Sequence, residues 1–334
     1  MIIVRTPFRV SFFGGGTDYP AWYEKNGGSV LSASINKYCY ITVRHLPPFF
    51  EHKTRIVWSK IELINHINEI QHPTVSAIIK FLNLGDSGLE IHHEGDLPAR
   101  SGLGSSSSFA VGLLHALYAL NGKLITKHEL ALNAIYVEQK IMKENVGSQD
   151  QVIVSYGGFN RIDFGDLNKV IVSPITITEQ RLNLFQQHIM LFFTGLARNA
   201  SEIAGEQIRN ITKKEVELKT MQQMVDEAIK ILANNNGESF DDFGKLLDEN
   251  WKLKKSLSSQ ISSPYIDEIY KKGIEAGALG GKILGAGSGG FILFFTKPDK
   301  QEKIKKALKN FLYVPVKFDY LGSQIIHYDQ TNNF

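Results

Sequence analysis

The pattern of hydrophobic and polar positions in the first part of the chain predicts strands, followed by helices. Residues 9–13 and 38–44 are rich in β-branched and aromatic side chains, which is typical of strands. Residues 74–84 place apolar side chains on one helical stripe, and residues 89–93 form a short run that predicts another strand. Residues 105–120 repeat apolar positions at helical spacing and predict a long helix.

The following helix carries a clear start signal. Thr126, followed three residues later by Glu129, predicts a capping box. The helix is expected to reach about Lys143, and Gly157 with Gly158 then interrupts the chain before further strands.

After about residue 180 the pattern changes. Residues 202–255 are mostly helical and rich in charge. Ser263, followed by a proline, predicts a helix start, and Gly277 predicts its end. Residues 291–295 predict a strand, and residues 299–312 predict a Lys-rich helix with two closing strands after it.

Strands and helices are mixed without a regular β-α-β-α alternation, so the sequence favours the α+β class. The length of 334 residues suits two lobes better than one core. We expect an N-terminal lobe over residues 1–180 and a C-terminal lobe over residues 181–334.

Composition narrows the possible partners. Lys and Arg number 37 against 34 Asp and Glu, a balance that gives no electrostatic argument for nucleic acid. Cys39 is the single cysteine, which excludes an intrachain disulfide and a multi-cysteine zinc site. No leader pattern is recognised and no apolar run approaches the roughly 20 residues that span a bilayer. We therefore expect a cytoplasmic protein with no membrane partner.

A glycine- and serine-rich segment opens the predicted helix at residue 105. Glycines allow close backbone approach, and the free N–H groups of a first helical turn bind phosphate. Serine hydroxyls can reach phosphate oxygens or Mg²⁺. An ordinary capped turn is the alternative, and a P-loop is excluded because no Lys-Ser/Thr pair follows the second glycine. The segment consists of Gly102, Leu103, Gly104, Ser105, Ser106, Ser107 and Ser108.

Residues 282–290 form a second glycine-rich segment. Gly285, Gly287 and Gly290 fit the Gly-x-Gly-x-x-Gly spacing of dinucleotide sites. Such a site needs a helix after the glycines, whereas a strand is predicted here, so we reject that interpretation. A tight turn between strands stays open as an alternative.

Residues 13–19 and 147–151 contain the candidate carboxylates. Asp18 follows three glycines and either faces a site, where it could bind two sugar hydroxyls, or bonds its own turn. Asp150, Glu138 and a nearby arginine could serve as base, metal ligand and charge stabiliser in phosphoryl transfer. Alternatively, Glu138 lies on a solvated helix face and Asp150 caps the next helix.

Taken together, these segments resemble the GHMP kinases, the family named for galactokinase, homoserine kinase, mevalonate kinase and phosphomevalonate kinase. The three motifs of that family are similar to residues 7–19, 98–108 and 282–290, in the same order. The resemblance spans nearly the whole chain. It implies a two-lobed fold, with an N-terminal lobe like the second domain of ribosomal protein S5 and a ferredoxin-like C-terminal lobe.

The resemblance also implies roles for individual residues. ATP would place its phosphates on the Gly102–Ser108 loop, with Mg²⁺ held by Ser106 and Glu138. Asp150 matches the family's catalytic aspartate, and Arg9 matches the basic residue that faces it. Residues 194–201 look like the segment that lines the acceptor site. The expected substrate-binding residues are Gly15, Gly16, Thr17, Asp18, Gly147, Arg198 and Gly287.

The first motif also suggests the acceptor. Gly15 and Gly16 stand where galactokinases have Glu-His, which disfavours galactose. Within the family, this motif most resembles the kinases that phosphorylate the anomeric hydroxyl of D-glycero-D-manno-heptose 7-phosphate on the route to GDP-heptose. Kinases of L-fucose or another free sugar are the alternative, and so is a non-catalytic sugar-binding paralogue. We expect ATP and a phosphorylated sugar as ligands, and a monomer or homodimer.

Overall fold

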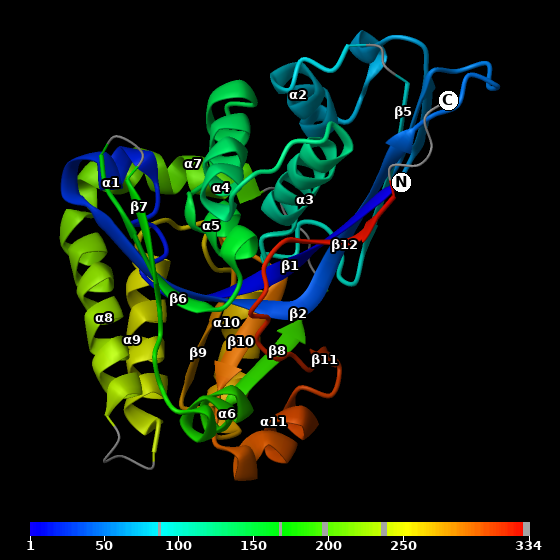
Figure 1. Ribbon diagram of the computed structural model, residues 1–334. Coiled ribbons are helices and arrows are strands. Elements are labelled where there is room, and N and C mark those ends of the chain that lie inside the picture. Colours follow the sequence, from blue (N-terminus) through cyan, green and yellow to red (C-terminus); the bar gives the residue numbers. More distant parts are fainter. Residues whose placement is uncertain (86–87, 167–168, 196–199, 235–238, 330–334) are drawn as a thin grey trace.

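The structure is a computed structural model that describes residues 1–85, 88–166, 169–195, 200–234 and 239–329. A large curved sheet carries helices on one face, and a smaller sheet lies beneath it (Figure 1). The first and last strands of the described chain pair in the large sheet, where Ile2 lies opposite Tyr328. Most strand pairs are antiparallel, so the α+β prediction is confirmed.

The large sheet has the strand order β12-β1-β2-β5-β3-β4, with β6 pairing with β2 and β7 with β6. The long strand β2 pairs with β1 along nearly its whole length. Its strands are β1 (Ile2–Phe13), β2 (Gly28–His45), β3 (Thr54–Val57), β4 (Ile61–Ile64), β5 (Leu89–Gly95), β6 (Phe159–Phe164), β7 (Val170–Pro174) and β12 (Gln324–Tyr328).

The small sheet has the order β11-β8-β10-β9, with antiparallel neighbours. Numbered within this sheet the order is 4-1-3-2, which is the ferredoxin-like arrangement that we expected. Its strands are β8 (Ile189–Phe193), β9 (Gly280–Ile283), β10 (Phe291–Phe295) and β11 (Leu312–Val314). The lobe boundary at residue 180 stays a prediction, and β12 lies in the large sheet.

Helices α2 to α5 lie over the large sheet, and α8 and α9 run side by side (Figure 1). The α-helices are α1 (Pro20–Asn26), α2 (Pro73–Phe81), α3 (Ser105–Leu120), α4 (Lys127–Tyr136), α5 (Gln149–Tyr156), α6 (Glu179–Gln187), α7 (Ala200–Asn210), α8 (Glu215–Ala233), α9 (Asp241–Ser256), α10 (Pro264–Glu275) and α11 (Gln301–Ala307). Short 3₁₀ turns span Ile67–Glu69, Ile211–Lys213 and Pro298–Lys300, and a π-helical turn spans Val137–Ile141.

Local start signals were sound predictors. The capping box of Thr126 and Glu129 is present, and Ser263 caps α10 through the N–H of Ile266. The predicted helix over residues 299–312 is wrong at its end, because α11 stops at Ala307 and residues 312–314 pair with β8. Strand pairing across the sheet outweighs the helical pattern there.

An aromatic core joins the two sheets. Phe12 of β1 makes edge contacts with Phe159, Phe185 and Phe243, whose ring centroids lie 5.6 to 5.9 Å away. Phe185 also contacts Phe295 of β10 at 5.4 Å. These buried rings come from both sheets and from α6 and α9, so they fix the lobes against each other.

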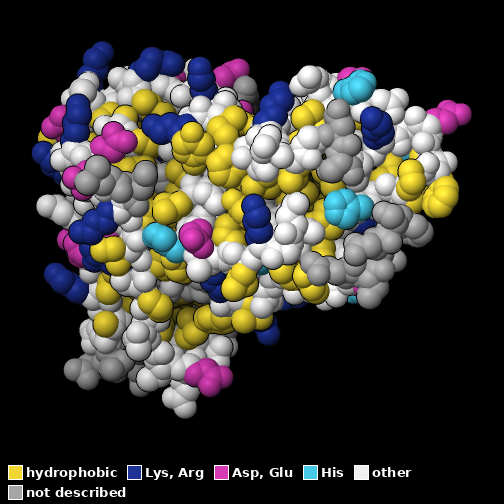
Figure 2. Space-filling model, turned by 45° about the horizontal axis from the view of Figure 1, so that its top comes forward, with side chains coloured by type: hydrophobic (Ala, Val, Ile, Leu, Met, Phe, Trp, Pro, Cys, Tyr) yellow, Lys and Arg dark blue, Asp and Glu magenta, His cyan; other side chains and the backbone are white. Residues whose placement is uncertain are grey.

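The visible surface is chemically mixed. On the face drawn in Figure 2, basic and acidic side chains are interspersed and hydrophobic side chains show between them. No helix in the described part of the chain is both long enough and apolar enough to span a membrane.

The two glycine-rich loops pack backbone against backbone. Ser101 O accepts a hydrogen bond of 3.0 Å from Phe291 N. A Cβ on Gly290 would lie 2.1 Å from Ser101 O, and a Cβ on Gly102 would lie 2.4 Å from Leu284 O. Both glycines also have positive φ, at +85° and +81°. The contact therefore requires glycine on both sides.

Gly290→Ala should consequently destabilise the protein by about 3 kcal/mol or more, because left-handed strain adds to steric overlap. Gly85→Ala is the matched control, since Gly85 has φ +61° but no atom within 4 Å of its Cβ position. The control should change the free energy of unfolding by less than about 1 kcal/mol, because strain is partly offset by reduced freedom of the unfolded chain. Urea denaturation of both variants measures the difference, and equal effects would contradict the packing argument.

Candidate active site

An ion pair joins the first motif to the start of α5. Arg9 Nε donates to Asp150 Oδ1 at 2.7 Å, and Arg9 Nη2 donates to Asp150 Oδ2 at 2.6 Å. The arginine side chain is 4% exposed, whereas that of Asp150 is 22% exposed. This bidentate geometry fixes the carboxylate while leaving one side of it open to a ligand. Asp150 lies in the first turn of α5 and does not cap it, because Ser148 is the N-cap residue.

The phosphate-loop candidate lies directly beside this pair. Arg9 Nη1 donates to Gly102 O at 2.5 Å, and Arg9 N donates to Leu103 O at 3.0 Å. Gly104 has φ +77°, and a Cβ there would approach Asp150 Oδ2 to 3.3 Å. Gly104 is also the N-cap of α3, which has no side-chain cap. The free end of α3 and its N–H groups therefore adjoin Asp150.

The four serines after Gly104 differ in their roles. Ser106 and Ser107 donate to the two oxygens of Glu138 at 3.1 and 2.9 Å. Ser108 is turned inward and donates to Pro7 O at 2.8 Å, while Ser105 Oγ accepts from Arg100 N at 3.1 Å. Ser106 is exposed and Ser107 is buried. Only some of these hydroxyls can therefore meet a ligand.

Glu138 is an interior residue. It is 1% exposed, and besides the two serines it accepts from Gln151 Nε2 at 2.5 Å. Burial raises its pKa to about 7, against the opposing effect of its three hydrogen bonds. The alternative of a solvated helix face is therefore wrong. Glu138 lies in the π-helical turn Val137–Ile141, an irregularity that is frequent at functional sites.

The donor set suits a hard cation with few protein ligands. Among the described residues no three His, Cys, Asp or Glu side chains gather as a metal cluster. Glu138 and Ser106 nevertheless bring a carboxylate and a hydroxyl together at the start of α3. Mg²⁺ prefers oxygen ligands and usually takes one or two carboxylates while phosphates and waters complete its shell. These residues fit Mg²⁺ bound together with a triphosphate.

Asp18 connects the first motif to the Gly147–Asp150 stretch. Its Oδ1 accepts from Gly16 N at 2.9 Å, and its Oδ2 accepts from Gln149 N at 3.4 Å. Burial raises its pKa. A Cβ on Gly147 would lie 1.9 Å from Asp18 Oδ2, so only glycine fits there. Asp18 thus bonds its own turn, as one interpretation of the sequence had it, and also contacts the Gly147–Asp150 stretch.

Of the other predicted acceptor residues, Thr17 faces the interior and Gly15 borders polar side chains. Thr17 is fully buried, and its hydroxyl donates to Gly14 O and Ser29 O, so it faces the interior. Gly15 borders the Ser11 hydroxyl and the Gln149 amide. The buried oxygens Ser11 Oγ and Gln149 Oε1 have no hydrogen-bond partner within the described structure. Buried polar atoms are normally paired, so these two favour a polar ligand beside Gly15.

Two buried lysines lie behind the triple-glycine turn, and sequence reasoning missed both as site residues. Lys254 Nζ donates to Gly15 O at 3.1 Å, and Lys282 Nζ donates to Phe12 O at 3.2 Å. Their exposed fractions are 5% and 4%. Burial lowers the pKa of Lys254 to about 8 and that of Lys282 to about 7. Lys282 opens the third motif, which was a usable signal, whereas Lys254 sits in an ordinary amphipathic helix.

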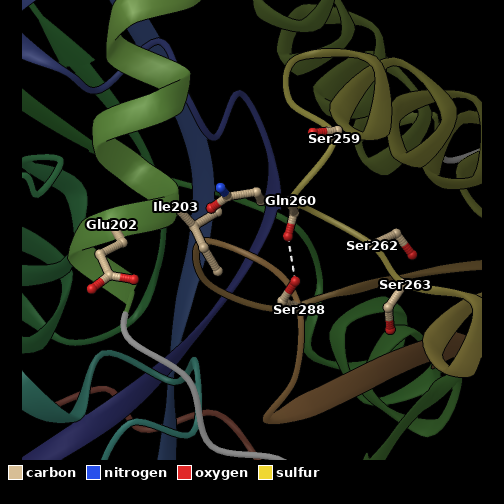
Figure 3. A pocket seen from close by; sticks show the side chains of 7 residues that line it. All are labelled: Glu202, Ile203, Ser259, Gln260, Ser262, Ser263 and Ser288. Carbon is tan, nitrogen blue, oxygen red and sulfur yellow. Dashed lines mark hydrogen bonds between the residues drawn. The ribbon is translucent and has the colours of Figure 1, made fainter.

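A cavity of about 270 Å³ lies beside the third motif. Figure 3 shows the first turn of α7 on one side, the segment from Ser259 to Ser263 on the other, and Ser288 between them with its hydroxyl pointing at the Gln260 carbonyl. Gly287, predicted to bind substrate, precedes Ser288 and packs against Ile261 O. The lining residues are Glu202, Ile203, Ser259, Gln260, Ser262, Ser263 and Ser288. Arg198 lies outside the described residues.

Comparison with known proteins adds two family matches. Residues 72–158 match the GHMP kinases N terminal domain, and residues 228–314 match the GHMP kinases C terminal domain. Together they cover just over half of the chain. The first match includes the phosphate loop, Glu138 and Asp150, and the second includes the third motif.

Curated relatives match along nearly the whole chain. The D-glycero-alpha-D-manno-heptose 7-phosphate kinase of Campylobacter jejuni is 29% identical over 92% of this chain and 93% of its own length. A galactokinase of Pyrococcus furiosus is 27% identical over 92% of both chains. A bifunctional fucokinase/GDP-fucose pyrophosphorylase of Arabidopsis thaliana is 23% identical over 94% of this chain and 32% of its own.

Solved structures share the fold. A D-glycero-D-manno-heptose 1-phosphate kinase of Bacteroides thetaiotaomicron superposes with a TM-score of 0.77 at 24% identity, over 98% of this chain and 99% of that one. A galactokinase of Lactococcus lactis complexed with galactose superposes with a TM-score of 0.72 at 19% identity, over 97% and 94%. With both halves matched and the fold shared throughout, the chain belongs to the GHMP kinase family.

Proposed function

We propose that this protein is an ATP-dependent kinase that phosphorylates the anomeric hydroxyl of D-glycero-D-manno-heptose 7-phosphate and so forms the 1,7-bisphosphate. The observation that carries the proposal is the bidentate pair of buried Arg9 and partly exposed Asp150 beside the free end of α3. A fixed carboxylate next to a phosphate-binding helix end suits phosphoryl transfer to a hydroxyl.

ATP would bind with its triphosphate on the loop from Gly102 to Ser108. The positive φ of Gly102 and Gly104 turns the backbone toward the ligand, and the uncapped N–H groups of α3 can donate to phosphate oxygens. Ser106 and Glu138 would hold Mg²⁺ there. When bound, the cation offsets the charge that develops on the phosphates.

Asp150 would receive the proton of the anomeric hydroxyl. The hydroxyl oxygen forms a bond to the γ-phosphorus, the bond from that phosphorus to the ADP oxygen breaks, and the proton passes to an Asp150 oxygen. Arg9 holds both carboxylate oxygens, so the exposed side of Asp150 is fixed for this transfer. Positioning of this kind can supply a large part of the rate.

The acceptor would lie between the first-motif turn and the Gly147–Asp150 stretch. The unpaired oxygens of Ser11 and Gln149 support a polyhydroxylated ligand beside Gly15. The names of two relatives support a phosphorylated heptose, although one names the 7-phosphate and the other the 1-phosphate. Phosphorylation of either monophosphate at its free end would give the same bisphosphate. Asp18, Gly16, Gly147, Gly287 and Arg198 stay predicted contacts.

Other functions are less well supported. The fucokinase relative keeps open a kinase of free L-fucose. A non-catalytic sugar-binding protein would have no need of the Arg9–Asp150 pair together with buried Glu138. Cytoplasmic location and a monomeric or homodimeric state remain predictions.

Asp150→Asn should lower kcat by about 10²-fold or more, because the amide cannot accept the proton and its charge is lost. ADP release with Mg-ATP and heptose 7-phosphate measures the effect. Asp163→Asn is the matched control, since Asp163 also pairs with an arginine, Arg161, at 2.8 Å but lies on β6 away from the motifs. A folded Asp150→Asn enzyme with the turnover of the control would remove Asp150 from the mechanism.

If Glu138 binds Mg²⁺, the Mg²⁺ concentration that the enzyme needs should depend on pH. Its raised pKa of about 7 means that the carboxyl is protonated below pH 7, and a protonated carboxyl binds cations poorly. The Mg²⁺ concentration for half-maximal kcat should therefore rise roughly tenfold between pH 8 and pH 6. Glu138→Gln should need more Mg²⁺ at both pH values and lack this part of the pH dependence. An unchanged Mg²⁺ titration in Glu138→Gln would exclude Glu138 as a ligand.

The acceptor prediction concerns the phosphate. An anionic phosphate makes charge-assisted hydrogen bonds, and a site built for it leaves polar groups unpaired when it is missing. The value of kcat/KM for D-glycero-D-manno-heptose 7-phosphate should therefore exceed that for the free heptose by about 10²-fold or more. The panel should include the 1-phosphate, L-fucose and galactose. Equal values for the two heptoses, or a higher value for fucose or for the 1-phosphate, would contradict the assignment.

A further inference from the structure

A series of buried hydrogen bonds connects two segments that carry predicted acceptor contacts, Gly16 in the first-motif turn and Gly287 in the third motif. We call these two segments the walls. Lys254 on α9 donates to Gly15 O at 3.1 Å and to Gln207 Oε1 at 2.6 Å. Gln207 on α7 in turn donates through Nε2 to Ala286 O at 3.0 Å. These hydrogen bonds thus lead from the triple-glycine turn of the first motif, through side chains on α9 and α7, to the third motif. We refer to this series as the Lys254–Gln207 bridge.

Both side chains of the bridge are withdrawn from solvent. Lys254 is 5% exposed and Gln207 is 4% exposed. The Gly16 Cβ position, on the same side of the turn, would face Lys254 together with the apolar Leu218 and Leu257. An ammonium group in such surroundings costs free energy, which a paired carboxylate usually offsets. Here the hydrogen-bond partners of Lys254 are a backbone carbonyl and an amide oxygen, and the buried Asp18 carboxylate favours its charged form only through space.

Such a costly arrangement is not needed to fill the space beside Gly16, Leu218 and Leu257. A leucine or methionine at position 254 would fill the same apolar space without a buried charge. What the lysine adds is a second donor bond: one ammonium binds the first-motif turn and α7 at the same time. Gln207 extends this connection, because its amide accepts from Lys254 at one atom and donates to the third motif at the other.

We propose that the Lys254–Gln207 bridge is a positioning device that sets the separation between the Gly15–Asp18 turn and the Ala286–Ser288 loop, and thereby the affinity for the acceptor. The proposal rests on the function proposed above. Walls that are fixed before binding spare the ligand the cost of ordering them. The phosphate loop has a backbone contact of its own, the packing of Gly102 on Leu284, so loss of the bridge should affect the acceptor more than ATP.

Three substitutions separate the two halves of the bridge. Lys254→Met removes the common donor and leaves the space filled. Gln207→Met removes the connection to both partners. Gln207→Glu keeps an acceptor for Lys254 but loses the donor to Ala286 O. Lys255→Met is the control, because the neighbouring Lys255 pairs with Asp267 on the surface and is 34% exposed.

Hydrogen exchange gives a readout that needs no substrate. The Thr17 amide is bonded to Gly14 O at 2.9 Å, and the Ser288 amide is bonded to Ile261 O at 2.8 Å, so each reports on one wall. Lys254→Met and Gln207→Met should speed exchange of both amides about tenfold. Gln207→Glu should speed exchange at Ser288 only, and Lys255→Met at neither. Unchanged exchange at both amides in the bridge variants would overturn the proposal.

Kinetics with heptose 7-phosphate tests the consequence for binding. Lys254→Met should raise the acceptor KM about tenfold, while kcat and the ATP KM stay within about threefold of wild type. An unchanged acceptor KM, or a fall in kcat alone, would overturn the positioning role. If wild type phosphorylates no heptose phosphate, the proposed function fails, and the exchange data still decide the bridge. If Lys254→Met does not fold, the two Gln207 variants carry the same test.

Discussion

The site depends on one close contact between the backbones of two glycine loops. The carbonyl of Ser101 bonds to the N–H of Phe291, and Gly102 lies against Leu284 with no room for a side chain. This contact holds the start of α3 against the β9–β10 hairpin. The candidate phosphate-binding turn is therefore held from the small sheet as well as from the large one, and a shift of either sheet would move it relative to Asp150. Glycine is needed here because the two backbones approach too closely for a side chain, as much as because φ is positive.

Several charged groups lie buried around the same site. Arg9, Lys254 and Lys282 are all 5% exposed or less, and Asp18 and Glu138 are buried beside or near them. Each such group costs free energy on folding unless its partners are well placed. The aromatic core around Phe12 lies directly beneath, and Phe12 O also accepts the bond from Lys282. Apolar burial there offsets what the polar groups cost.

Local signals predicted the elements well because caps and strand patterns act within a few residues. Ser263 and the capping box at Thr126 needed no knowledge of the fold. The candidate residues of the motifs were predicted from glycine and serine spacing together with the family resemblance, and their roles stay predictions. Lys254 could not be predicted, because nothing in its surroundings distinguishes it from Lys255. Only the tertiary packing of α9 against the first-motif turn buries one lysine and leaves the other in solvent.

A wrong prediction from the local sequence pattern is informative when the residue concerned is charged. Glu138, with Gln139 and Lys140 beside it, was compatible with a solvated face, yet it is buried and bonded to serines of the phosphate loop. The error at Leu312 involves an apolar residue that exchanges a helix for a strand, and it touches no motif. A buried charged residue departs from the local sequence pattern, which predicts exposure, and it also lowers the stability of the fold. Sequences keep such residues mainly at functional sites, so the buried carboxylate and the buried lysine mark the site independently of the glycine motifs.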